Sequence, residues 1–143
     1  MNLPHHYTAS ASASPEGNVS LTGDGLSEIQ SHAPKEFGGP GGQWSPEDLL
    51  VAAVADCFVL SFRAIAAMSK FDWITLRCEA SGTLDKIDRA MQFTAFDIKA
   101  TLTVPESADK NRAQRLLEKA EATCFITNSL KAGSHLETTI ETA

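Results

Sequence analysis

The chain has 143 residues, of which 43% are apolar and 21% charged, and this length and composition are typical of one soluble globular domain. Its net charge of −6 lies entirely in residues 1–62, which carry seven carboxylates and a single cation, Lys35. Because Lys and Arg form no cluster, we expect neither a nucleic acid nor a membrane surface as a partner. From the length and composition, we expect residues 1–143 to form a single domain.

The start of the sequence, its apolar stretch and its cysteines indicate the cellular location that we expect for the protein. No basic segment followed by an apolar run opens the sequence, so we expect no secretory signal. The apolar stretch 49–68 contains Asp56 and Arg63, which argues against a membrane span. Three cysteines, an odd number, do not make a disulfide framework. These features favour the cytoplasm.

The first third of the chain predicts short strands and turns. Residues 7–13 and 19–22 alternate apolar and polar side chains, and a Gly-Asp-Gly turn precedes residues 26–30. Residues 34–42 are so rich in Pro and Gly that we expect an irregular loop there.

A strong helix signal follows. Ser45 stands at the N-cap, Pro46 at the first helical position, and Asp48 completes a variant of the capping box. Residues 49–68 are apolar on nearly every side, which predicts a long buried central helix that ends near residues 70–72.

Two strands and a second helix are predicted next. Residues 74–84 alternate strictly, while residues 90–104 change phase near Thr94, which indicates a bulge. A second helix is predicted to open at residues 105–107, to carry Cys124 and to stop at Gly133. A last strand covers residues 136–140. The order β-β-β-α-β-β-α-β predicts an α+β fold with an antiparallel sheet around the central helix.

The three cysteines allow two interpretations. Each taken alone is most simply a small core residue, and Cys78, on the apolar face of its strand, fits this best. The alternative pairs Cys57 with Cys124 as the attacking and resolving thiols of a peroxide reductase. That chemistry needs a thiolate, which burial disfavours and which a close carboxylate such as Asp56 would also disfavour.

The run from Glu36 to Phe58 carries a Gly-rich loop, Ser-Pro-Glu, an apolar helix and a cysteine ten residues after Glu47. It resembles the family of osmotically inducible protein C and organic hydroperoxide resistance protein (OsmC/Ohr). Residues 120–124, Ala-Glu-Ala-Thr-Cys, fall where that family has its second cysteine.

The resemblance implies an intertwined homodimer with active sites at the subunit interface and a thiol peroxidase that acts on organic hydroperoxides in oxidative stress defence. By the same resemblance, Cys57 is the peroxidatic cysteine, Cys124 the resolving cysteine and Glu47 a site carboxylate. A dithiol, such as a lipoyl-type one, is the implied reductant. No haem, flavin or nicotinamide cofactor and no metal is expected.

Helix geometry adds a constraint on Glu47. Ten residues of helix separate it from Cys57 by about 15 Å and roughly 80° of rotation, so the two side chains cannot touch on one helix. If both serve one site, we expect Glu47 to come from the other subunit.

Three positions depart from the family pattern. The family pairs its glutamate with an N-terminal arginine, but this chain has no arginine before Arg63. Lys35 is the candidate substitute, although a solvated loop lysine is the simpler interpretation. Asp56 precedes the cysteine where a small residue is common, and Phe125 follows Cys124 where proline is common.

Two other functions stay open. The missing arginine favours a binding protein of the same fold that holds a small apolar or electrophilic ligand and has weak or no peroxidase activity. A metal site would need Cys57, Cys124 and one of the four histidines, and no ligand spacing supports it. The histidines are His5, His6, His32 and His135.

Overall fold

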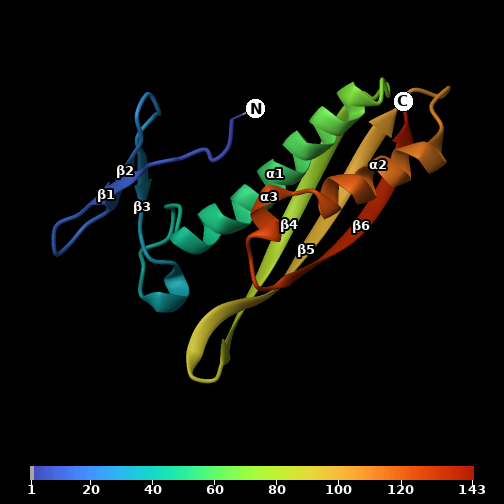
Figure 1. Cartoon of the computed structure of the whole chain (residues 1–143). Coiled ribbons are helices and arrows are strands. Elements are labelled where there is room, and N and C mark those ends of the chain that lie inside the picture. Colours follow the sequence, from blue (N-terminus) through green and yellow to red (C-terminus); the bar gives the residue numbers. More distant parts are fainter. Residues whose placement is uncertain (1) are drawn as a thin grey trace. The chain divides into compact units, whose positions relative to one another are not determined.

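The computed structural model describes residues 2–143 (Figure 1). The elements follow in the order β1 (Ser10–Ser12), β2 (Val19–Thr22), β3 (Ile29–Ser31), a 3₁₀ turn η1 (Lys35–Phe37), α1 (Pro46–Met68), β4 (Thr75–Ile87), β5 (Ala90–Val104), α2 (Lys110–Ala122), α3 (Phe125–Asn128) and β6 (Gly133–Thr142). The predicted α+β order is confirmed, with η1 and α3 as additions. The chain divides into two compact units, one up to Leu50 and one from Val51 onward.

The first unit is built on an antiparallel sheet of order β1-β2-β3. The Gly-rich loop returns to this sheet, where the N–H of His32 donates to the carbonyl of Trp44 at 2.9 Å. Inside the loop, Gly41 and Gly42 have φ values of 80° and 77°, a conformation that glycine adopts without strain. The loop is therefore anchored at both ends, although most of it is irregular, as predicted.

The predicted cap of α1 is confirmed. Ser45 Oγ accepts from the Asp48 N–H at 3.0 Å, and Asp48 Oδ2 accepts from the Ser45 N–H at 3.2 Å and from its hydroxyl at 2.8 Å. Ser45 is only 1% exposed, so these bonds are protected from water. The reciprocal pairing satisfies donors at the helix start that would otherwise have no partner.

Along its length, α1 buries one stripe of side chains spaced four residues apart. The stripe consists of Val54, Phe58, Phe62 and Ala66. Other apolar residues of the helix stay accessible, among them Leu60 at 49% and Met68 at 85% exposure. By length and composition α1 is the one helix of residues 2–143 that could cross a membrane, a test that core helices also pass. Within residues 2–143, the exposed side of α1 therefore combines apolar residues with the charged Asp56 and Arg63.

The second sheet has the order β4-β5-β6. β4 and β5 pair antiparallel, as predicted. The antiparallel prediction is wrong for β6, which is parallel to β5 because α2 and α3 carry the chain back along the sheet (Figure 1). The predicted bulge is confirmed: Thr83 pairs with Ala95 and Leu84 with Phe93, which leaves Thr94 unpaired. Every second residue of β5 from Phe96 to Val104 is buried, so the core lies on one face of this sheet.

Two polar contacts tie α2 to the end of α1. The Arg112 guanidinium donates to the carbonyl of Ser69 and lies over the ring of Phe71 at 5.5 Å. The predicted start of α2 at residues 105–107 is wrong. The side chain of Asp109 accepts from the N–H groups of Asn111 and Arg112, and this cap makes Lys110 the first helical residue.

Candidate functional site

Cys57 lies in the middle of α1, half-buried, and groups from α1 itself and from the start of α3 influence its sulfur. Burial is the largest influence and raises the pKa of the thiol. Hydrogen bonding outweighs burial and lowers the pKa below its ordinary value. The hydrogen-bonding groups are the backbone of Ile126, the Cys124 side chain, the Ser61 side chain and the backbone of Phe125. Neutral donors therefore favour the thiolate at this position.

Cys124 is fully buried, and the prediction that it lies on the second helix is wrong. α2 ends at Ala122, and Cys124 has an extended backbone (φ −66°, ψ 117°) that makes it the N-cap of the short helix α3. Its carbonyl accepts from the N–H of Asn128 at 3.0 Å and from the Thr127 hydroxyl at 3.3 Å. The residues at this break, Cys124 through its side chain and Phe125 and Ile126 through their backbone, help to lower the pKa of Cys57.

The structure thus brings Cys57 and Cys124 together, although 67 positions separate them in the sequence. It also brings in Ser61, Phe125 and Ile126, which sequence reasoning did not assign to the site. Only Ser61 carried a signal, because it follows Cys57 by one helical turn. The roles of Phe125 and Ile126 are played by their backbone, which no side-chain pattern reveals.

Cys78 behaves differently from the other two cysteines. It lies on β4 opposite Ala100 and is half-buried. Burial, and then the charge of a Cys124 thiolate, raise the pKa of Cys78 to about 11. A thiol with so high a pKa is a poor nucleophile at neutral pH, which fits the core interpretation.

The residue before Cys57 is a carboxylate, Asp56, which the sequence predicted to disfavour the thiolate if it lay close to the sulfur. Asp56 is exposed, and it is not among the groups that shift the pKa of Cys57. Asp56 therefore does not raise the pKa of the Cys57 thiol.

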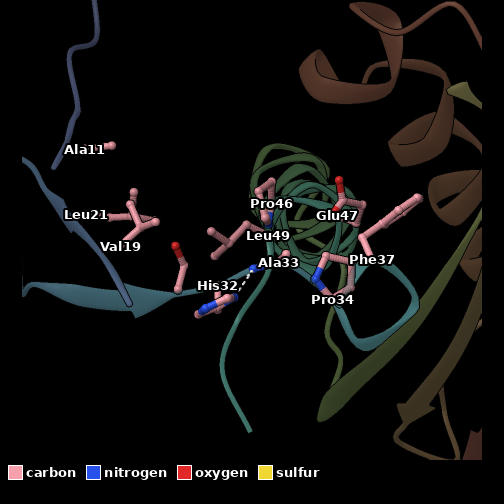
Figure 2. A pocket seen from close by; sticks show the side chains of 11 residues that line it. Ala11, Val19, Leu21, His32, Ala33, Pro34, Phe37, Pro46, Glu47 and Leu49 are labelled. Carbon is pink, nitrogen blue, oxygen red and sulfur yellow. Dashed lines mark hydrogen bonds between the residues drawn. The ribbon is translucent and has the colours of Figure 1, made fainter. Parts of the chain in front are cut away.

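Glu47 belongs to the first unit, at the start of α1. It lines an apolar pocket of about 620 Å³, whose side chains come from β1, β2, the end of β3, the segment from His32 to Phe37 and the first turn of α1 (Figure 2). Its Oε1 atom is buried and has no hydrogen-bond partner among residues 2–143. A buried, unpaired carboxylate oxygen costs free energy, so this position calls for a donor from elsewhere.

Lys35, the candidate substitute for the missing arginine, is exposed on η1. Its aliphatic chain lies against Gly41, where an added Cβ would collide with Lys35 Cε. Lys35 is not one of the residues around the pocket of Glu47. Its position fits the simpler interpretation, a loop lysine packed along the Gly-rich segment.

The metal hypothesis gains nothing from the geometry. In the part of the chain that the structure describes, residues 2–143, no three His, Cys, Asp or Glu side chains are grouped to hold an ion. His32 lies at the pocket of the first unit, where its Nδ1 accepts from the Ala33 N–H at 2.8 Å.

Comparisons with known proteins show what this chain is similar to. The family described as OsmC-like protein matches residues 39–139. Peroxiredoxin OsmC of Escherichia coli is 30% identical over 88 residues, 62% of this chain and 61% of that protein. An organic hydroperoxide resistance protein of Xanthomonas axonopodis pv. citri is 28% identical over 140 residues, 94% of each.

Among solved structures, an OsmC-like protein of unknown function from Vibrio cholerae superposes with a TM-score of 0.86 at 19% identity. The match covers 95% of this chain and all of the other. At that identity the likeness concerns the fold. Because the family match spans most of the sequence, both cysteines included, the chain belongs to the OsmC-like protein family.

Proposed function

We propose that this chain is a cysteine-based peroxidase that reduces organic hydroperoxides to alcohols in the cytoplasm, as part of oxidative stress defence. The carrying observation is the surroundings of Cys57, where hydrogen bonding lowers the pKa of the thiol and the Cys124 side chain faces the sulfur. The two relatives described above, a peroxiredoxin and a hydroperoxide resistance protein, support the same chemistry.

The proposed reaction has three steps. The Cys57 thiolate attacks the terminal oxygen of the hydroperoxide, the O–O bond breaks, and the alkoxide takes a proton from solvent to leave as the alcohol. Cys57 is now a sulfenic acid, and the thiol of Cys124 attacks its sulfur, forming a disulfide and releasing water. An external dithiol, for which a lipoyl-type compound is the expected class, then reduces the disulfide and is itself oxidised.

Two observations support a homodimer as the working form. Apolar residues of α1, among them Leu60 and Met68, are exposed in residues 2–143 beside the charged Asp56 and Arg63, and such a mixture of exposed apolar and charged side chains occurs at subunit interfaces. The buried Oε1 atom of Glu47 also lacks a donor among residues 2–143. In our proposal a second subunit covers α1, and Glu47 serves the site of the partner's Cys57.

A second candidate function rests on the apolar pocket of the first unit. Its volume of about 620 Å³ is within the range of small-molecule sites. A binding protein for a small apolar ligand would use this pocket and would need neither cysteine.

Consumption of cumene hydroperoxide with a dithiol reductant separates the two candidates. Loss of the nucleophile in Cys57→Ser lowers the rate at least about a thousandfold if the peroxidase proposal holds. Cys78→Ser is the matched control and stays within about twofold of wild type, because its thiol is held protonated. Equal rates for wild type and Cys57→Ser would contradict the peroxidase and favour the binding protein.

A further inference from the structure

The side chain that follows Cys57 by one helical turn is a hydroxyl. Residues four apart on a helix share a face, and Ser61 Oγ lies 3.9 Å from Cys57 Sγ. Both side chains are half-buried. Among the hydrogen bonds of residues 2–143, this is the one that the Ser61 hydroxyl makes.

The chemistry of the pair fixes the direction of the bond once the thiol is ionised. A thiolate has no proton to donate, so the serine hydroxyl must donate to it. A hydrogen bond to an anion in a partly dry environment is stronger than one between neutral groups, and so it favours the ionised form of the sulfur.

The other titratable and charged groups near Cys57 do not supply a cation. From α1, Asp56 and Arg63 are exposed. From the junction of α2 and α3 comes the thiol of Cys124, and from β4 the thiol of Cys78, which interacts with Cys124. The side chain that offers Cys57 a permanent donor from its own helix is Ser61.

We propose that Ser61 is a thiolate-stabilising residue of the Cys57 site and takes over part of the role that a cation would play. This inference rests on the proposed function, since it concerns the attacking sulfur of that reaction. The stabilising hydroxyl lies on the same helix as the cysteine, so this part of the thiolate stabilisation does not depend on the N-terminal segment.

The test is a titration of the Cys57 thiolate by its ultraviolet absorbance, with the titration of Cys57→Ser subtracted as a blank. In Ser61→Ala we expect the pKa of Cys57 to rise by about 0.5 to 1, a three- to tenfold loss of thiolate below that pKa. Ser61→Thr keeps the hydroxyl and restores the wild-type curve. Ser69→Ala, the same deletion just beyond the end of α1, leaves the curve unchanged.

The pH profile of hydroperoxide reduction distinguishes this role from a structural one. In Ser61→Ala, kcat/KM falls by the same three- to tenfold at pH values below the pKa and matches wild type well above it. Alanine has a higher helix propensity than serine, so we expect α1 to remain intact.

Coincident titrations of Ser61→Ala and wild type, or a Ser61→Thr curve that follows Ser61→Ala, would overturn the inference. The titration requires no peroxide, which keeps it separate from the proposed function. If Ser61→Ala shifts the pKa but no variant reduces hydroperoxide, the peroxidase proposal fails and the role of Ser61 stands. If the enzyme is active and the curves coincide, the reverse holds.

Discussion

Cys57 and Glu47 lie ten residues apart on α1, and they differ in the hydrogen-bond partners that the described chain gives them. The sulfur of Cys57 faces donors from its own helix and from the start of α3, and these donors offset the cost of burial. The buried Oε1 atom of Glu47 has no donor among residues 2–143, although its pocket is formed by one compact unit.

The difference separates the Cys57 thiol, whose hydrogen-bonding groups come from the same chain, from the Glu47 carboxylate, whose buried oxygen has none among residues 2–143. Neutral hydrogen-bonding groups within the second unit lower the pKa of Cys57, and no arginine is among them. The buried Oε1 atom of Glu47, in contrast, has no hydrogen-bond partner among residues 2–143. In our proposal, Glu47 acts at the site of the partner's Cys57.

Subunit complementation tests that proposal and carries the largest expected effect. In the rate of hydroperoxide reduction, Cys57→Ser homodimers should lose at least about a thousandfold and Glu47→Gln homodimers about tenfold or more. If Glu47 acts on the partner's Cys57, a mixed dimer contains one intact site. Random exchange of subunits between the two variants then restores about a quarter of wild-type activity, measured with cumene hydroperoxide and a dithiol.

The control for this experiment is a mixture of Cys57→Ser with Cys57→Ala, which contains no intact site under any assembly. A Glu47→Gln and Cys57→Ser mixture that stays as inactive as this control, after exchange has been verified by mass, would mean that Glu47 acts within its own chain. A fully active Glu47→Gln homodimer would remove Glu47 from the site.

A smaller effect is expected from Ser45→Ala, which should destabilise the start of α1 at Glu47 without changing the pKa of Cys57. The variant removes the cap of α1 and should lower the free energy of unfolding by about 1 kcal/mol, measured by urea denaturation. The first helical turn, which carries Glu47, loosens, whereas the donors around Cys57 are untouched. A change in the pKa of the Cys57 thiol in this variant would contradict the separation of the two regions.

Much of the fold was predictable because the local signals were strong. Ser45 and Asp48 form the predicted cap, and the change of phase near Thr94 is the observed bulge. The end of α2 was missed, since no Gly or Pro stands between Ala120 and Phe125 and the break depends on the extended backbone of Cys124. Sequence periodicity does not record such a turn.

The proximity of Cys57 and Cys124 was predictable, whereas the backbone groups beside them were not, and the roles of these residues stay a prediction. The pairing of Cys57 with Cys124 followed from the resemblance, and the structure brings the two side chains together. The search for a replacement cation pointed to Lys35, but the donors that lower the pKa of Cys57 include main-chain groups of Ile126 and Phe125. Any residue other than proline supplies such a donor, so residue identity cannot reveal it.

The most direct test of the central claim is the fate of the cysteines after one turnover. The fully reduced protein is treated with one equivalent of cumene hydroperoxide, digested without reductant and mapped by mass spectrometry. We predict loss of two hydrogens and a single linked peptide pair that joins Cys57 to Cys124, with Cys78 still a free thiol. Recovery of Cys57 unmodified, or joined to Cys78, would contradict the assignment of Cys57 and Cys124 as the reacting pair.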